Sequence, residues 1–270
     1  MPTMKIGDIN IYHEIHGEGE PLVLIMGLGA DSSRWFRIVP IFSKEYRVIT
    51  FDNRGVGESS KPDIPYTMEM MADDTAGLLD AIGIDTAHVF GVSMGGMIAQ
   101  HFALRHPQMT SSLILGCTRC GGPHSITEET GATGVLAPDL IETMTAEDRA
   151  RALLPFLFSR EFIENNPVAI EENIALQVEH PIDPISYARQ LQAANGHDTY
   201  DRLPDITAPT LVITGEADRL ISSENSRILA SRIPGAELVM LEKAGHGFHT
   251  EAMDETCRTV IDFMKRYRQS

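Results

Sequence analysis

The regular alternation of short apolar runs with helical segments is the feature that most constrains the fold of this chain. Such runs are typical of strands buried on both faces of a sheet. They recur at Leu22–Met26, Tyr46–Phe51, Ala87–Phe90, Ser112–Gly116, Thr210–Thr214 and Glu237–Leu241. Alternation of this kind indicates an α/β fold with a mostly parallel sheet and helices on both faces.

Two further strands are predicted ahead of these, because Gly7-Asp8 separates Met4–Ile6 from Ile9–Ile15 in a hairpin pattern. Together the segments give an eight-stranded sheet. Helices are expected between the strands, each with its own start and stop signals. They cover about 34–43, 68–82 after a Thr67 cap, 94–106, 222–233 and 250–267.

The alternation stops between about Gly121 and Gly196. This stretch carries short helical signals, several prolines and no convincing strand. We therefore predict an all-helical insertion that divides the chain into a first core part (1–120), the insertion (121–198) and a second core part (199–270).

Charge and hydropathy narrow the class of protein. The 270 residues include 22 basic and 38 acidic side chains, a formal charge of −16, and 43% are hydrophobic. An acidic chain of ordinary apolar content does not favour nucleic acids or anionic membrane surfaces as partners. No apolar stretch approaches the roughly 18 to 20 residues that span a bilayer. The first residues also lack the apolar region of a signal peptide, so we expect a cytoplasmic protein.

The three cysteines raise the question of a metal or redox site. Cys117 and Cys120 have C-x-x-C spacing, and Cys257 stands alone. No second C-x-x-C or paired His/Cys set completes a zinc site. We expect buried thiols in a reducing compartment and no metal or cofactor.

The central motif is Gly91-Val92-Ser93-Met94-Gly95, a G-x-S-x-G placed between a predicted strand and a predicted helix. A nucleophile on such a sharp turn needs small residues two positions away on each side. The helix that follows places partial positive charge where an anion would develop. Ser93 is therefore the candidate nucleophile.

A serine nucleophile requires a base to take its proton and an acid to orient that base. Both should follow later strands. Asp218 comes after Thr210–Thr214, and His246 comes after Glu237–Leu241. Glu216 is the rival acid. His249 forms a His-x-x-His pair with His246, but no nearby carboxylate or cysteine set supports a metal there.

An oxyanion hole needs two backbone N–H groups aimed at the developing charge. One should come from Met94, the residue after the nucleophile. The other should come from the loop Gly27-Leu28-Gly29 after the strand Leu22–Met26, and Leu28 is the candidate.

These features resemble the α/β-hydrolase superfamily over nearly the whole chain. Besides the order Ser, Asp, His, the segment Met26–Gly29 resembles the family's His-Gly oxyanion loop, with Met26 in place of His. The segment Asp52–Ser59 resembles its D-x-R-G-x-G-x-S loop. The elbow and the insertion resemble the branch of carboxylesterases, enol-lactonases, pimeloyl methyl ester esterases and cofactor-free haloperoxidases.

The resemblance implies that the insertion forms a lid over the nucleophile. Its many apolar side chains should line part of a substrate pocket. Trp35, just after the oxyanion loop, and Arg119, just after a strand end, are candidate substrate contacts. The alternative for Trp35 is burial in the core. Arg119 could hold a substrate carboxylate, and its alternative is an ion pair at the surface or in the lid, which is the commoner role of a lone arginine.

We therefore expect a hydrolase that cleaves a carboxylic ester or lactone with a largely apolar acyl part, using Ser93, His246 and Asp218. The alternatives are a cofactor-free haloperoxidase or perhydrolase with the same triad, and a small-ligand receptor without catalysis. The chain is expected to be a monomer or a homodimer.

Overall fold

An eight-stranded sheet forms the centre of the protein, as predicted. The computed structural model describes residues 3–127 and 132–267, and its strand order is β1-β2-β4-β3-β5-β6-β7-β8. The strands are β1 (Thr3–Ile6), β2 (Ile9–His16), β3 (Glu20–Ile25), β4 (Tyr46–Phe51), β5 (Ala87–Val92), β6 (Thr110–Gly116), β7 (Thr210–Gly215) and β8 (Glu237–Leu241). Only the pairs β1–β2 and β2–β4 are antiparallel, and the remaining pairs are parallel.

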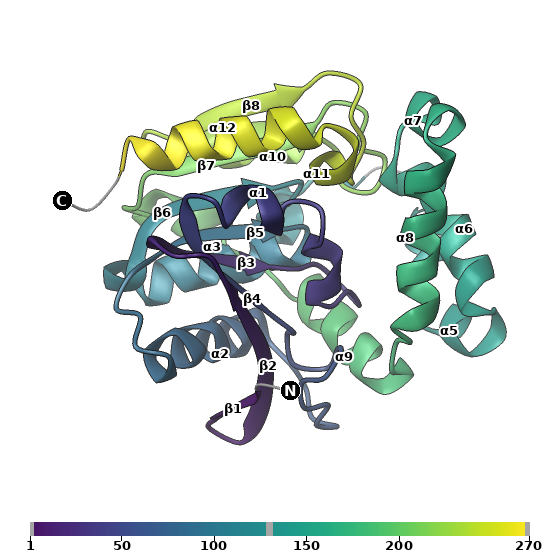
Figure 1. The fold of residues 1–270 in the computed structure, drawn as a ribbon, viewed down its shortest axis with the longest axis horizontal. Helices are drawn as coiled ribbons and strands as arrows, with labels where there is room; N and C mark the ends of the chain where they lie inside the picture. The colour runs from purple at the N-terminus through teal and green to yellow at the C-terminus, as the bar shows by residue number, and fades with distance from the viewer. Residues whose placement is uncertain (1–2, 128–131, 268–270) are drawn as a thin grey trace.

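Each face of the sheet packs against its own set of helices (Figure 1). One core contains side chains from α2 (Met68–Ala81), α3 (Met94–Arg105) and α10 (Glu224–Arg232). The other contains side chains from the short α1 (Val39–Phe42) and the long α12 (Met253–Lys265). Side chains of β3 alternate between the two cores, as expected for a strand covered on both faces.

Two predicted helices differ from the structure. The helix expected over 34–43 is instead a 3₁₀ turn at Ser32–Trp35 followed by α1. Pro40 explains the break, because inside one continuous helix it would lack a donor and clash with the preceding turn. The helix expected over 250–267 begins earlier, as α11 (Phe248–Glu251), and breaks at Ala252. No residue type at Ala252 signals that break.

Helices α4 to α9 lie between β6 and β7, where the sequence predicts a helical insertion. They are α4 (Ala132–Val135), α5 (Asp139–Thr143), α6 (Ala146–Leu157), α7 (Arg160–Asn165), α8 (Pro167–Glu179) and α9 (Pro184–Asn195). Figure 1 shows α5 to α8 as a group beyond the ends of the strands, with α9 reaching back to the sheet. A single β-bridge between Gly121 and Asp198 joins the two ends of the insertion. The division into three sequence segments stays a prediction.

The lengths and compositions of the helices indicate whether any of them could span a membrane. Among the residues that the structure describes, no helix combines the length and the apolar composition needed to cross a membrane.

Candidate active site

Ser93 stands on the sharp turn that joins β5 to α3. Its backbone has φ 56° and ψ −124°, a left-handed conformation that is strained for any residue but glycine. A Cβ on Gly91 would lie 2.2 Å from the carbonyl oxygen of Gly95. A Cβ on Gly95 would lie 2.1 Å from the carbonyl oxygen of Ile25. Only glycine fits at these two positions, so the motif forms the tight turn that the sequence predicts.

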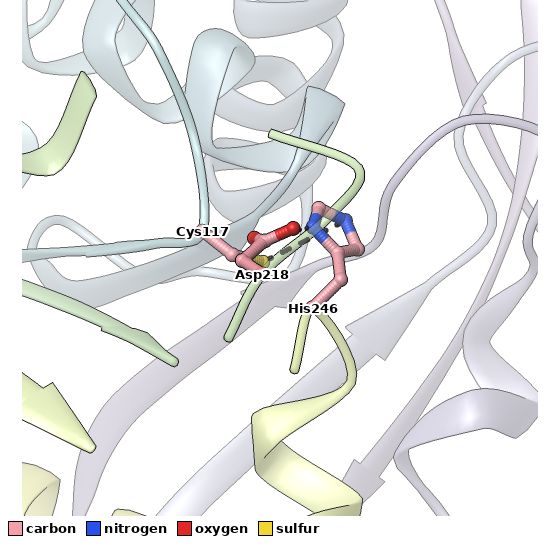
Figure 2. A group of neighbouring side chains, drawn as sticks. All are labelled: Cys117, Asp218 and His246. Atoms are coloured by element: carbon pink, nitrogen blue, oxygen red, sulfur yellow. Dashed lines mark hydrogen bonds and ion pairs between the residues drawn. The ribbon is translucent and has the colours of Figure 1, made fainter. Parts of the chain in front are cut away.

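His246 and Asp218 meet at the carboxyl end of the sheet (Figure 2). His246 Nδ1 lies 2.8 Å from Asp218 Oδ2, and both side chains are buried. The other oxygen of Asp218 accepts hydrogen bonds from the backbone N–H groups of Leu220 and Ile221. The carboxylate is thereby held in one orientation toward the imidazole.

The rivals for these two positions lie elsewhere. Glu216 is exposed to solvent and Asp218 is buried, so the carboxylate that contacts His246 is that of Asp218. The ring of His249 packs against Trp35 at 5.4 Å between centroids. Burial lowers the pKa of His249 to about 4, with a smaller effect from the charge of His246. His249 is therefore a neutral, packed histidine.

Cys117 contacts His246, which the sequence analysis does not predict. Its Sγ lies 3.8 Å from His246 Nε2 (Figure 2). Among the described residues, the donor atoms of Cys117, Asp218 and His246 all lie within 4.8 Å of one another. Both oxygens of Asp218 already accept hydrogen bonds, so the protein itself accounts for this cluster. The predicted absence of a metal stays a prediction.

The pKa values of His246 and Cys117 are both raised, but for different physical reasons. Burial disfavours the charged imidazole of His246, but the Asp218 carboxylate, with a further contribution from Cys117, outweighs burial and raises the pKa of His246 well above 6.5. Burial also raises the pKa of the Cys117 thiol. The thiol is thus neutral at ordinary pH, and the charge beside His246 is that of Asp218.

A cavity of about 590 Å³ opens over these residues. Ser93 and His246 line it together with Leu28 and Met94, and most of the remaining wall is apolar. No hydrogen bond joins the Ser93 hydroxyl to His246 in the part of the chain that the structure describes. Hydrogen bonds between catalytic groups are often long or poorly aligned before a substrate binds. Ser93 and His246 therefore remain the candidate nucleophile and base.

The two predicted oxyanion residues come from adjacent loops. Met94 is the first residue of α3, where a backbone N–H has no partner within the helix. Leu28 lies in the loop after β3, and a Cβ on its neighbour Gly27 would lie 3.0 Å from Ser93 Cβ. The loop therefore passes directly beside the nucleophile.

Gln190 on α9 holds this loop, and the sequence analysis misses it. Its side-chain oxygen accepts from Gly29 N at 2.9 Å, and its amide nitrogen donates to Arg54 O at 2.8 Å. Gln190 is fully buried. No local motif marks this residue, because its two partners lie far away in the sequence.

The two predicted substrate contacts have different positions. Trp35 is fully buried in the core around Phe90 and does not line the cavity, so that prediction is wrong for Trp35. The short 3₁₀ turn that carries Trp35 directs its ring inward. Arg119 does line the cavity, and its role as a substrate contact stays a proposal.

Comparisons with known proteins identify the family of this chain. The family model described as "alpha/beta hydrolase fold" matches residues 20–252. A relative from Azorhizobium caulinodans, named "Putative carbamate hydrolase RutD", is 31% identical over 97% of this chain and 98% of its own.

Solved structures resemble the protein over its whole length. The enol-lactonase from Burkholderia xenovorans LB400 has a TM-score of 0.88 and 30% identity, covering 98% of this chain and 100% of its own. A thermophilic esterase from Thermogutta terrifontis has a TM-score of 0.86 and 27% identity, with both chains fully covered. This chain therefore belongs to the α/β-hydrolase family and is a hydrolase.

Proposed function

We propose that the protein hydrolyses a carboxylic ester or lactone with Ser93 as nucleophile, His246 as base and Asp218 as the orienting acid. One observation carries the proposal. Ser93 lies on a strained turn in the wall of a cavity, and the hydrogen-bonded pair of His246 and Asp218 lines or supports the same wall. A partly exposed serine and an imidazole in the wall of one pocket, with a buried carboxylate behind the imidazole, are the parts that acyl transfer requires.

The reaction proceeds in two halves. Ser93 Oγ attacks the carbonyl carbon while His246 Nε2 takes the hydroxyl proton. The tetrahedral intermediate collapses, the bond to the leaving oxygen breaks, and that oxygen receives the proton from His246. A water then gives its proton to His246, attacks the acyl-enzyme and releases the carboxylic acid with Ser93 restored.

The backbone N–H groups of Leu28 and Met94 are proposed to stabilise the oxyanion. Both residues line the cavity, and the N-terminus of α3 adds partial positive charge at the same place. The hydrogen bond from Gly29 N to Gln190 supports the loop that carries Leu28.

The helical insertion is proposed to act as a lid that selects the acyl or alcohol group. Its residues supply a large share of the apolar wall, including Leu153, Leu157, Phe158, Leu176 and Leu191. A mostly apolar wall favours a substrate with a substantial apolar part.

The test is hydrolysis of a graded series of p-nitrophenyl acyl esters and simple lactones by the wild type and by Ser93→Ala. We expect turnover in the wild type and a loss of at least about 10⁴-fold in Ser93→Ala with folding intact. A fluorophosphonate probe should label the wild type at Ser93 alone. Turnover that persists in Ser93→Ala would contradict the mechanism.

A second candidate substrate is a carbamate, because several relatives near 30% identity carry the name "Putative carbamate hydrolase RutD". The same nucleophile and base would serve. Adding p-nitrophenyl carbamates to the series distinguishes the ester from the carbamate as substrate. A higher kcat/KM for a carbamate than for an ester of equal size would favour the carbamate. A bromination assay with acetate and halide tests the perhydrolase alternative in the same preparations.

A further inference from the structure

The charge of the cavity is opposite to that of the protein as a whole. Four arginines line it, and in the described part of its wall there is no aspartate or glutamate. They are Arg34, Arg37, Arg119 and Arg149. The chain carries a formal charge of −16, so a wall with positive side chains and no described acidic one is a local exception.

Three of these arginines have protein partners that hold their guanidinium groups. Arg37 forms an ion pair with Glu172. Arg34 donates to the carbonyl oxygen of Asn173 at 3.2 Å. Arg149 donates to carbonyl oxygens at the end of α5 and just beyond it. These contacts with the protein explain the positions of the three guanidinium groups.

Arg119 differs from the other three. Across residues 3–127 and 132–267, its guanidinium makes no hydrogen bond or ion pair, and its Nε is buried without a partner. An arginine is always charged in proteins, and a charge withdrawn from water without a partner costs free energy. Burial accordingly lowers the pKa of Arg119. An anion bound in the cavity would supply the partner that the charge of Arg119 lacks in the protein.

The backbone of Arg119 is fixed beside the nucleophile. Its carbonyl oxygen accepts from Gln100 Nε2 at 3.0 Å and lies 3.1 Å from the ring of His197. The preceding residue, Thr118, donates its hydroxyl to Ser93 O at 2.7 Å. The side chain of Arg119 therefore extends into the cavity from an anchored segment that contacts the turn of Ser93.

We propose that the substrate carries a second, ionised carboxylate, and that Arg119 binds it while Ser93 attacks the neutral ester or lactone carbonyl of the same molecule. This inference rests on the proposed function. The planar guanidinium matches a carboxylate with two parallel hydrogen bonds. Both residues line one cavity whose wall is mostly apolar, which suits a carbon chain joining the two groups. The substrate class is thus a half-ester of a dicarboxylic acid, or a lactone with a free acid group.

The test compares two substrates that differ only at the far end of the acyl chain. They are p-nitrophenyl pentanoate, which ends in a methyl group, and mono-p-nitrophenyl glutarate, which ends in a carboxylate. For the wild type we expect kcat/KM to be at least about tenfold higher for the glutarate. Arg119→Gln should lower kcat/KM for the glutarate by about 10- to 100-fold, mainly through KM, because a charge-assisted contact is lost. The pentanoate should change less than about twofold by the same reasoning.

Arg37→Gln is the matched control, since it also removes one positive charge from the wall but leaves the anchored Arg119. It should keep the preference for the glutarate. Equal kcat/KM for both substrates in the wild type would overturn the inference. So would an equal loss on both substrates in Arg119→Gln, because that pattern indicates a structural role.

Binding of free glutarate to Ser93→Ala, measured by calorimetry, separates this inference from the proposed function. Glutarate binding that Arg119→Gln abolishes supports the anion site even if no ester is hydrolysed. Ester turnover without glutarate binding keeps the hydrolase mechanism and rejects the anion site.

Discussion

The sheet body and the helical insertion of this protein are stabilised in different ways. The body has two extensive apolar cores, one on each face of the sheet. The insertion's own buried apolar core is small: Ala150, Leu154, Phe158, Ile170 and Ile174. A segment with so little apolar burial depends on its contacts with the body for a fixed position. The body can therefore hold the reactive residues in fixed positions, while the insertion can change the shape of the pocket.

Polar contacts from the insertion nevertheless reach both reactive loops. Gln190 bonds to the loop that carries Leu28. Ser159 bonds to Glu251, whose carboxylate also accepts from Gly245 N, next to His246. Positioning of the reactive groups is thus shared between the two regions. The predictions below concern four positions, Asp218 and Arg54 in the body and Gln190 and Ser159 in the insertion, and they separate the share of each region.

The largest effect is expected within the body, from Asp218→Asn. An amide cannot stabilise the imidazolium and favours the wrong tautomer of His246, so kcat should fall about 10⁴-fold. The fold should persist, because the amide is isosteric. Steady-state kinetics on the best ester, beside circular dichroism, measure both. A loss below tenfold would mean that another acid orients His246.

The pH dependence follows from the same pair. Protonated His246 cannot accept the Ser93 proton, so kcat/KM should fall as pH decreases through the pKa of His246. Because Asp218 raises that pKa well above 6.5, the wild type should be most active at alkaline pH. In Asp218→Asn the charge that most raises the pKa of His246 is lost, while burial still lowers that pKa, so the residual activity should extend to lower pH. A shift of that limb toward higher pH would contradict the assignment.

The second effect concerns the stability of the body beneath the insertion. Arg54 forms a buried, two-hydrogen-bond ion pair with Asp74 on α2. Arg54→Met leaves the Asp74 carboxylate buried without a partner, which costs about 3–5 kcal/mol of unfolding free energy. The control is Arg105→Met, which removes the exposed ion pair between Arg105 at the end of α3 and Asp73, the neighbour of Asp74 on α2. It should cost less than about 1 kcal/mol. Equal losses in urea unfolding would mean that burial of the pair adds nothing.

Local sequence signals predict the body well because its structure is local in sequence. A strand followed by a Gly-flanked turn and a helix places Ser93 from a few adjacent residues, and parallel strands bring their carboxyl ends to one edge. That edge carries His246 and Asp218, which meet as predicted. The insertion lacks such rules. Its short helices follow prolines and caps, and their packing depends on partners far away in sequence.

The missed and misplaced residues have this cause in common. Gln190 is 161 positions from Gly29, and Cys117 is 129 positions from His246, so no motif joins them. Trp35 lies a few positions after the oxyanion loop in the sequence. The 3₁₀ turn that replaces the predicted helix nevertheless directs its ring into the core. Proximity in sequence therefore predicts which loop a residue belongs to, but it does not predict the direction in which the side chain points.

The third prediction tests the contact of the insertion with the oxyanion loop. Gln190→Met keeps the volume but leaves Gly29 N and Arg54 O without partners. We expect kcat to fall about 10- to 100-fold, because the Leu28 N–H is held less accurately for the oxyanion. Fluorophosphonate labelling of Ser93 should persist at a reduced rate. Gln192→Ala, an exposed change on the same helix, is the control. If both variants have the same kcat, Gln190 does not position the loop.

The smallest effect is expected at the second contact, between Ser159 and the His246 loop. Ser159→Ala and Thr145→Ala each remove a side-chain cap from a helix of the insertion, so each should cost about 1 kcal/mol locally. Only Ser159 also bonds Glu251, which supports the loop of His246. We therefore expect Ser159→Ala to lower kcat by roughly three- to tenfold, because loss of a supporting hydrogen bond loosens the base. Thr145→Ala should leave kcat unchanged. If both variants lower kcat alike, the insertion acts on catalysis only through its own stability, and the sharing of positioning between the two regions is limited to Gln190.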